Sequence, residues 1–208
     1  NVLDDSVLTA NINTVTSLDV NNDSIADLTG IEDFTALTNL NCNGNQLSNL
    51  DVTVNTALRV LVCSSNQLNS LDVSNNLILQ SLVLYDNQVL NLDLTSNTIL
   101  DYLRCENTGL TSLDLSSNTV LRYLYCDNNS LSELDVSNNY NISRISCGNN
   151  QIDSLDLSVL SFLYELHAVN NQLVFLDIKN GNNSNVTLFK TTNNPNLTCI
   201  SVDDTAYS

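Results

Sequence analysis

The chain has 208 residues, of which 42% are hydrophobic and only one is proline, a composition that predicts a single folded domain over residues 1–208. Its formal net charge is −17 with only six Lys and Arg residues, which argues against nucleic acid as a partner because phosphate backbones are bound mainly through basic side chains. No apolar run approaches the roughly 20 residues that cross a bilayer, so we expect no membrane insertion, and the start at Asn1 indicates a processed or excised module.

Residues 1–14 show no periodicity and are predicted to be the remnant of an N-terminal cap. A repeating unit follows over residues 15–181, where the first step is 22 residues long and every later step is 21. The segment LTNLNCNGNQL at 37–47 matches the leucine-rich-repeat consensus L-x-x-L-x-L-x-x-N-x-L, with Cys in place of the third Leu. The eight copies begin at Val15, Leu37, Leu58, Leu79, Leu100, Leu121, Ile142 and Leu163.

Each copy predicts one coil of a curved, right-handed solenoid. Apolar fourth and sixth positions alternate with outward residues, which is typical of a short strand buried on one side. Such strands would stack into a parallel, concave sheet of about eight or nine strands. The second half of each coil repeats the pattern L-D-V/L-S/T-x-N, which leaves no room for helices, so we expect a convex side that is strand-like or irregular.

Two columns of Asn are predicted to hold the corners of each coil. The Asn at the ninth position, for example Asn45, is expected to bond backbone groups that a tight bend leaves unpaired. Asp23 replaces it in the first coil and Thr108 in the fifth, where Asn107 lies one residue early and a locally altered turn is expected. Residues 182–208 insert Pro195 and drift from the register, which predicts a terminating coil that caps the open end.

The repeats resemble those of known bacterial proteins. The segment IADLTGIEDFTALTNL at 25–40 resembles internalin-type repeats, and the unit L-x-x-L-x-C-x-x-N-x-L-x-x-L-D-V-S-x-N resembles secreted leucine-rich-repeat proteins of the Bacteroidetes, especially flavobacteria. The resemblance spans roughly Val15 to Asp204. It implies an exported or surface-displayed protein that acts in recognition or adhesion, often with a C-terminal sorting domain beyond Ser208. It carries over no ligand-binding residues.

Five of the six cysteines occupy the inward sixth position, where a thiol acts as a small apolar filler. Their Cβ vectors run parallel, whereas a disulfide needs a χ3 near 90°, so a reduced ladder is favoured over some bridging or metal binding. Cys199, outside this register, is also predicted to be buried and unpaired. The five cysteines of the ladder are Cys42, Cys63, Cys105, Cys126 and Cys147.

A column of aspartates follows the second-half Leu of each coil. We expect each carboxylate to accept hydrogen bonds from the following Ser/Thr and backbone turn. A calcium-bearing edge is the alternative, because hard cations favour rows of carboxylate oxygens. The column comprises Asp51, Asp72, Asp93, Asp114, Asp135, Asp156 and Asp177.

The outward positions of the predicted sheet are the candidate ligand-binding site. All four Arg residues and five of the seven Tyr residues of the chain lie on or beside these strands, and Tyr and Arg are enriched at binding hot spots. The alternative is that wide side chains only shield the sheet, with Arg pairing across rungs to Glu106 or Asp127. The second position of the repeats, at the sheet edge, adds Arg59, Arg122 and Tyr164. The candidate site residues are Tyr85, Tyr102, Arg104, Glu106, Arg122, Tyr123, Tyr125, Asp127, Arg144, Glu165 and His167.

These patterns favour a binding module over an enzyme. His167 is the only histidine, and no catalytic motif or phosphate loop is present in the sequence, so we expect no cofactor. The first hypothesis is an extracellular or cell-surface monomer that recognises a protein partner. The second is a carbohydrate-binding module in which Tyr stacks on sugars while Arg104, Arg122 and Arg144 pair with an acidic polysaccharide. The third is a rigid spacer.

Overall fold

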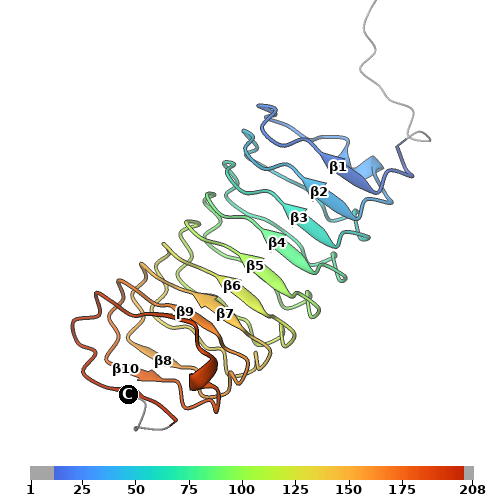
Figure 1. Ribbon diagram of the computed structural model, residues 1–208. Coiled ribbons are helices and arrows are strands. Elements are labelled where there is room, and N and C mark those ends of the chain that lie inside the picture. The colour runs from blue at the N-terminus through green and yellow to red at the C-terminus, as the bar shows by residue number, and fades with distance from the viewer. Residues whose placement is uncertain (1–11, 204–208) are drawn as a thin grey trace, which may run out of the picture.

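The computed structural model describes residues 12–203, which form a stack of short coils with one long parallel sheet along a single side (Figure 1). Residues 1–11, most of the predicted N-terminal cap, lie outside the described residues, as do residues 204–208. In order, the sheet comprises β1 (Ser17–Asp19), β2 (Asn39–Asn41), β3 (Val60–Val62), β4 (Ser81–Val83), β5 (Tyr102–Arg104), β6 (Tyr123–Tyr125), β7 (Arg144–Ser146), β9 (Glu165–His167) and β11 (Leu188–Lys190).

The sheet register follows the period of the sequence. Leu40 of β2 pairs with Leu61 of β3, which in turn pairs with Leu82 of β4, so the same position of each repeat lines up along the sheet. The middle residue of β2 to β7 and of β9 is buried, and its two neighbours are less buried. The predicted solenoid with a nine-stranded parallel sheet is therefore confirmed.

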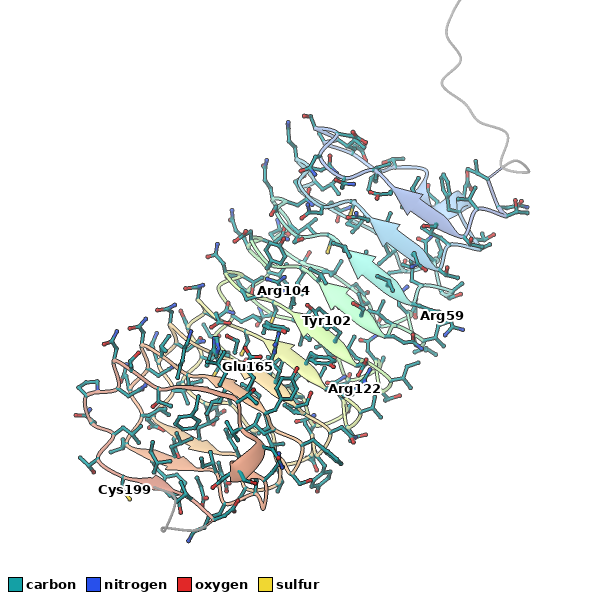
Figure 2. The ribbon with its side chains drawn as sticks, in the orientation of Figure 1. Arg59, Tyr102, Arg104, Arg122, Glu165 and Cys199 are labelled. Carbon is teal, nitrogen blue, oxygen red and sulfur yellow. The ribbon has the colours of Figure 1, made fainter. Side chains whose placement is uncertain are left out.

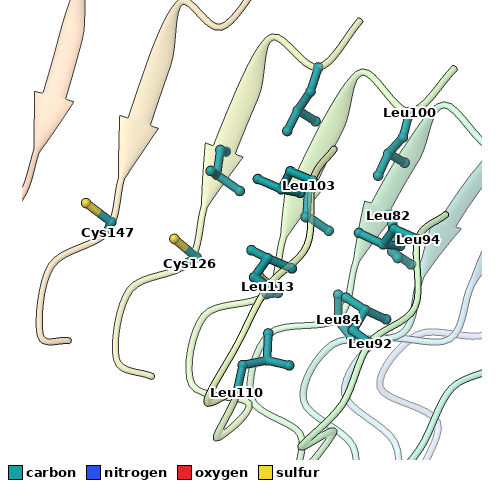
Figure 3. Packing of buried hydrophobic residues seen from close by; sticks show 14 of the residues in the cluster. Leu82, Leu84, Leu92, Leu94, Leu100, Leu103, Leu110, Leu113, Cys126 and Cys147 are labelled. Atoms are coloured by element: carbon teal, nitrogen blue, oxygen red, sulfur yellow. The ribbon is translucent and has the colours of Figure 1, made fainter. Parts of the chain in front are cut away.

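The hydrophobic core lies between this sheet and the second half of each coil (Figure 3). Leu82 and Leu84 come from the sheet side, and Leu92 and Leu94 face them from the opposite wall. Because every coil contributes the same few inward positions, the core is one continuous cluster from Ile31 to Ile178.

The opposite side of the coils is mostly irregular, as predicted. A second parallel sheet forms only toward the C-terminal end, in the order β12-β10-β8. Its strands are β8 (Ser154–Asp156), β10 (Phe175–Asp177) and β12 (Ile200–Ser201). Within residues 12–203 the helices are the three-residue 3-10 helices η2 (Ile31–Asp33) and η3 (Asn183–Asn185), and neither has the length or apolarity needed to span a membrane.

The ninth-position Asn acts as predicted, and it also ties neighbouring coils together. The Asn87 amide donates to the carbonyl of Leu84 in its own coil at 2.9 Å and to that of Cys63 in the preceding coil at 3.1 Å. Its Oδ1 accepts the N–H of Leu68 at 3.0 Å. One buried side chain thus satisfies three backbone groups.

The coil that carries Thr108 has the altered turn expected from its sequence. The Thr108 hydroxyl donates to the carbonyl of Cys105 at 2.9 Å. This reproduces the hydrogen bond that a ninth-position Asn makes to the carbonyl three residues earlier in its own coil. Gly109 adopts a φ of +84°, in the left-handed region that favours glycine. Its N–H donates to Asn129 Oδ1 at 2.9 Å, whereas the equivalent Gln88 donates to the carbonyl of Leu68.

The second Asn column is buried and donates in the same way at the other corner. Asn97, for example, donates to the carbonyls of Val73 and Asn76, each at 3.0 Å. Most coils are therefore bonded to the coil before them at two corners as well as along the sheet. The fifth coil lacks the ninth-position bond because it carries Thr108, and the coil of β7 lacks the second because Leu160 stands in place of the Asn.

Candidate binding face on the nine-stranded sheet

The predicted site residues emerge from the solvent-facing side of β5, β6, β7 and β9 or lie beside these strands. Figure 2 shows Tyr102 and Arg104 over the strands, with Arg59 and Arg122 at one edge of the sheet. The outer residues of these four strands are half-buried, because each is flanked by side chains of the neighbouring coils.

Three tyrosines form the centre of this face. The ring centroid of Tyr102 lies 5.9 Å from that of Tyr123 and 5.8 Å from that of Tyr125, at interplanar angles of 49° and 48°. These tilted pairs fall within the favourable range for aromatic contacts. Partial burial raises the pKa of Tyr102, because it disfavours the ionised phenolate.

Arg104 is held between two tyrosine rings and a carboxylate. Its guanidinium carbon lies 4.5 Å from the ring centroid of Tyr85 and 5.5 Å from that of Tyr125. Its Nε and Nη2 both donate to Glu106 Oε1, at 2.9 and 2.6 Å. Because cations are attracted to ring faces, this arginine joins β5 to the coils on either side.

Arg144 lies in β7, one coil beyond Tyr125, at the position that pairs with Tyr123. Its Nη1 donates to the Tyr125 hydroxyl at 2.8 Å, and its guanidinium lies 5.9 Å from the Tyr125 ring centroid and 5.7 Å from that of Tyr164. It forms an ion pair with Glu165, and Nε2 of His167 lies 3.3 Å from Oε1 of the same carboxylate. Tyr125 is thereby contacted by two arginines.

Arg122 lies at the edge of the sheet. It forms an ion pair with Asp101, one coil away, with 2.6 Å between Nη2 and Oδ2, and its guanidinium lies 5.5 Å from the Tyr123 ring centroid. The residues linked by these contacts are called the Tyr–Arg cluster: Tyr85, Tyr102, Arg104, Arg122, Tyr123, Tyr125, Arg144 and Tyr164.

Nine of the eleven predicted site residues belong to this cluster or contact it. His167 reaches it only through Glu165, and Asp127 differs. Its Oδ1 accepts hydrogen bonds from Ser146 Oγ at 2.9 Å and the Gly148 N–H at 2.8 Å, so it bonds the next coil instead of an arginine. The suggested pairing of Arg with Glu106 across rungs is wrong, because Arg104 and Glu106 lie in one coil.

Two parts of this face were missed from the sequence. Asp101 is the carboxylate partner of Arg122, and reading second positions for acids as well as bases would have found it. The outward residues of β3 and β4 include Val60, Val62 and Val83, all half-buried. Val62 pairs with Val83, which pairs with Arg104, so these valines form an apolar strip next to the cluster that a search for Tyr and Arg passes over.

The cysteine ladder is reduced and buried, as predicted. The five sixth-position thiols are free and have no solvent exposure, and burial raises the pKa of Cys42 to about 12. Cys199 is free, as predicted, but the prediction that it is buried is wrong, because this thiol is exposed. It follows Pro195, where the chain has left the 21-residue register that directs the other thiols inward.

The aspartate column serves the turns. The Oδ1 atom of each carboxylate accepts the N–H two residues later at 2.8–3.0 Å. At Asp93 the hydroxyl of Thr95 also donates, at 2.7 Å, and these bonds lower the pKa of the carboxyl. These hydrogen bonds favour the turn interpretation of the aspartate column over the calcium alternative.

The chemistry that the cluster offers is recognition through stacking and directed hydrogen bonds. Arg104, Arg122 and Arg144 each have a carboxylate partner, so their charges are balanced within the face. What remains available is the surface of the Tyr rings and guanidinium planes, which combine apolar area with hydrogen-bonding edges.

Comparisons with known proteins identify chains that are similar to this one in sequence and in structure. No family model matches the sequence. A 52-residue stretch, 25% of the chain, is 48% identical to internalin J of Listeria monocytogenes, of which it covers 6%. The solved functional domain of InlJ from Listeria monocytogenes, which includes a cysteine ladder, is 28% identical with a TM-score of 0.56, and the match covers 91% of this chain and 56% of that one.

A second solved structure gives a higher TM-score. The leucine-rich-repeat protein LIC12759 of Leptospira interrogans has a TM-score of 0.74 at 22% identity, over 90% of this chain and 50% of that chain. The matches therefore cover a little over half or less of each of these three proteins. The fold is that of a leucine-rich-repeat solenoid, with internalin-like proteins among its neighbours in sequence and in structure.

Proposed function

We propose that the chain is a non-catalytic recognition or adhesion module that binds a protein partner through the Tyr–Arg cluster. The observation that carries this proposal is that eight Tyr and Arg side chains form one contact-linked surface on the sheet. Solenoids commonly use such a sheet face for binding. The resemblance of the repeats to exported proteins supports an extracellular or cell-surface location.

The contacts within the cluster support binding because they order it in advance. Arg104 and Arg144 are each fixed by a carboxylate and by ring contacts. Immobilising a flexible side chain on binding costs about 0.5–1.5 kcal/mol, and here much of that ordering precedes the partner. Tyr and Arg that are already ordered and half-buried have the properties of hot-spot residues.

An acidic polysaccharide is the second candidate, and the ion pairs disfavour it. The arginines needed to pair with its anionic groups already pair with Asp101, Glu106 and Glu165. A polyanion would have to displace these carboxylates and approach a chain whose net charge is −17. A protein surface needs only the rings and guanidinium planes.

The test compares cluster variants with a matched variant elsewhere on the same sheet. Arg104→Ala and Tyr123→Ala remove cluster residues, whereas Asn41→Ala changes the position in β2 equivalent to Arg104. Each chain is immobilised, and we measure proteins captured from extracts of the cells and medium of the source organism, beside a glycan array at low salt. We expect both cluster variants to lose at least tenfold in affinity for a captured protein, a hot-spot loss of about 1.4 kcal/mol or more, with Asn41→Ala unchanged.

Signal on acidic glycans that depends on Arg104 would instead support the polysaccharide. If every captured partner binds the cluster variants as well as the unmodified chain, both binding hypotheses fail and the rigid spacer remains.

A further inference from the structure

A row of exposed apolar side chains follows the edge of the nine-stranded sheet, in the turns that precede its strands. Their exposed fractions run from 38% to 62%, values more typical of polar residues. The residues, called the edge row, are Leu77 (58%), Ile99 (38%), Val120 (40%), Tyr140 (54%) and Phe162 (62%).

The turn itself does not require these side chains. In the turn before Leu58, Thr56 and Ala57 occupy the same two positions, and the Leu58 N–H donates to the carbonyl of Asn55 at 3.0 Å. The corresponding bond from Leu100 to Asn97 beside Ile99 is also 3.0 Å. The backbone is therefore the same with small residues, and the edge row exposes apolar area that the fold does not use.

The edge row lies beside the Tyr–Arg cluster. Val120 and Arg122 are two residues apart, and Figure 2 shows Arg122 at the sheet edge with Tyr102 over the strands. With coils about 4.8 Å apart, the four steps from the coil of Leu77 to that of Phe162 extend over about 19 Å. Asp101, the ion-pair partner of Arg122, also follows a member of the row, Ile99, by two residues, so the row borders the cluster at this edge of the sheet.

The turn segments that carry the edge row have a different net charge from the rest of the molecule. The segments that carry this edge are residues 52–59, 73–80, 94–101, 115–122, 136–143 and 157–164. They contain two arginines, Arg59 and Arg122, and one acid, Asp101, which gives +2 − 1 = +1 on a chain of net charge −17. Desolvating this edge therefore removes few charges from water, which favours contact with an apolar surface.

The size of the row indicates what covers it. Exposed apolar patches of a few hundred Å² mark interaction sites, but a stable interface needs about 800 Å² from each partner. Five half-exposed side chains fall short of that area alone, so a partner that binds here stably would have to cover neighbouring surface such as the cluster as well. A second copy of the chain would also bring a second charge of −17, which disfavours self-association.

We infer that the partner of the Tyr–Arg cluster is a folded protein that covers the edge row at the same time, with an apolar part of its surface against Ile99, Val120 and Phe162. An extended peptide or a sugar chain lying over the strands would leave the row exposed. This inference rests on the proposed function and specifies the class of partner.

Photo-crosslinking tests both ideas separately. Benzoylphenylalanine is placed at Phe162 in the row, at Tyr123 in the cluster, and at Leu90 as a control. Leu90 is equally exposed, at 56%, but lies in the turn after β4 rather than before a strand. Each chain is irradiated in extracts of the cells and medium of the source organism, and the crosslinked products are identified by mass spectrometry.

The expected result is that positions 123 and 162 crosslink to the same protein and position 90 does not. A partner that crosslinks only at position 123 overturns the edge row and leaves the proposed function standing. Crosslinking at neither position overturns both. A product of twice the chain mass identifies a second copy, and equal yields at position 90 identify nonspecific adhesion; either result also overturns the inference.

Substitutions supply a second readout. The triple variant Ile99→Ala, Val120→Ala and Phe162→Ala restores the Ala found at position 57 and should keep the fold, as circular dichroism can verify. We expect it to weaken binding to the crosslinked partner at least tenfold, with Leu90→Ala unchanged. Unaltered binding by the triple variant would contradict the inference.

Discussion

The sixth-position thiol shows how a single residue fits this solenoid. Cys42, Cys105 and Cys126 replace the Leu of the consensus with a smaller apolar side chain, and each is fully buried. Their neighbours along the ladder are parallel in direction, which explains why they stay free although adjacent coils are close. Burial raises the pKa of these thiols, which keeps them protonated and unreactive.

Thiol labelling measures this arrangement directly. In the folded chain at pH 8 we expect iodoacetamide to modify one cysteine, Cys199, and after unfolding in guanidinium to modify all six. The count is read by intact mass. Cys199→Ser should abolish labelling of the folded chain, and rapid modification of more than one thiol in the native state would contradict the buried ladder.

The two outcomes for cysteine also show what a sequence period can and cannot predict. Five thiols were placed correctly because they share one phase of a 21-residue repeat whose inward positions are fixed by core packing. Cys199 was misplaced because the last coil is longer than the others. Leu166 pairs with Phe189 and Leu176 pairs with Ile200, so the 21-residue phase no longer says which way a side chain points there.

Within one coil, the ninth-position side chain determines how firmly the coil is held to its neighbours. An Asn supplies two donors and an acceptor, whereas Thr108 has a single donor, which it uses on the carbonyl of Cys105. An Asn at position 108 would add two hydrogen bonds to the preceding coil: its amide would donate to the carbonyl of Leu84, and its Oδ1 would accept the N–H of Val89, as Asn87 does with Cys63 and Leu68. The fifth coil is therefore less firmly bonded to the fourth than its neighbours are to each other.

Thr108→Asn is expected to stabilise the protein. Two added hydrogen bonds, each with a net contribution of about 0.5–1.5 kcal/mol, predict a gain of about 1–2 kcal/mol in the free energy of unfolding. Urea unfolding followed by circular dichroism would measure it. As a control, the reverse change in the next coil, Asn129→Thr, should lower the free energy of unfolding by a similar amount. If Thr108→Asn instead lowers it, the turn at Gly109 is adapted to Thr and the prediction is contradicted.

The second sheet is an element that the repeat pattern did not resolve. Asp114 and Asp156 follow the same Leu in almost identical segments, yet only the later segment forms a strand, β8. The pairing of β8, β10 and β12 depends on how closely neighbouring backbones approach at the C-terminal end, which the side-chain pattern does not encode.

At the scale of the whole molecule, the sequence predicted which side chains share a face but not which contact each other. Register alone brought the Tyr and Arg residues to one side of the sheet. Their pairing depends on side-chain length and rotamer: Arg104 bends to Glu106 in its own coil, whereas Arg122 reaches Asp101 in the previous one. These choices become visible only with all neighbouring coils in place.

The distribution of charge is the other property of the whole molecule. The net charge of −17 is spread along the coils and destabilises the compact chain by self-repulsion, while three Arg–carboxylate pairs act in the opposite direction. Partly exposed pairs contribute about 0–1 kcal/mol each. Salt screens both effects beyond a Debye length of about 10 Å at 0.1 M. Added salt should therefore weaken the long-range repulsion among the many like charges more than it weakens the attraction within the three short ion pairs.

Raising NaCl from 10 mM to 300 mM at pH 7 is accordingly expected to increase Tm. Each kcal/mol of relieved repulsion raises Tm by about 2–4 °C in a chain of this length, and scanning calorimetry would detect the shift. The control is the same titration near the sequence pI of about 4.1, where the net charge approaches zero and the increase should disappear. A Tm that falls with NaCl at pH 7 would mean that the ion pairs of the Tyr–Arg cluster outweigh the repulsion, and the cluster would then contribute to folding stability as well as offering a surface for binding.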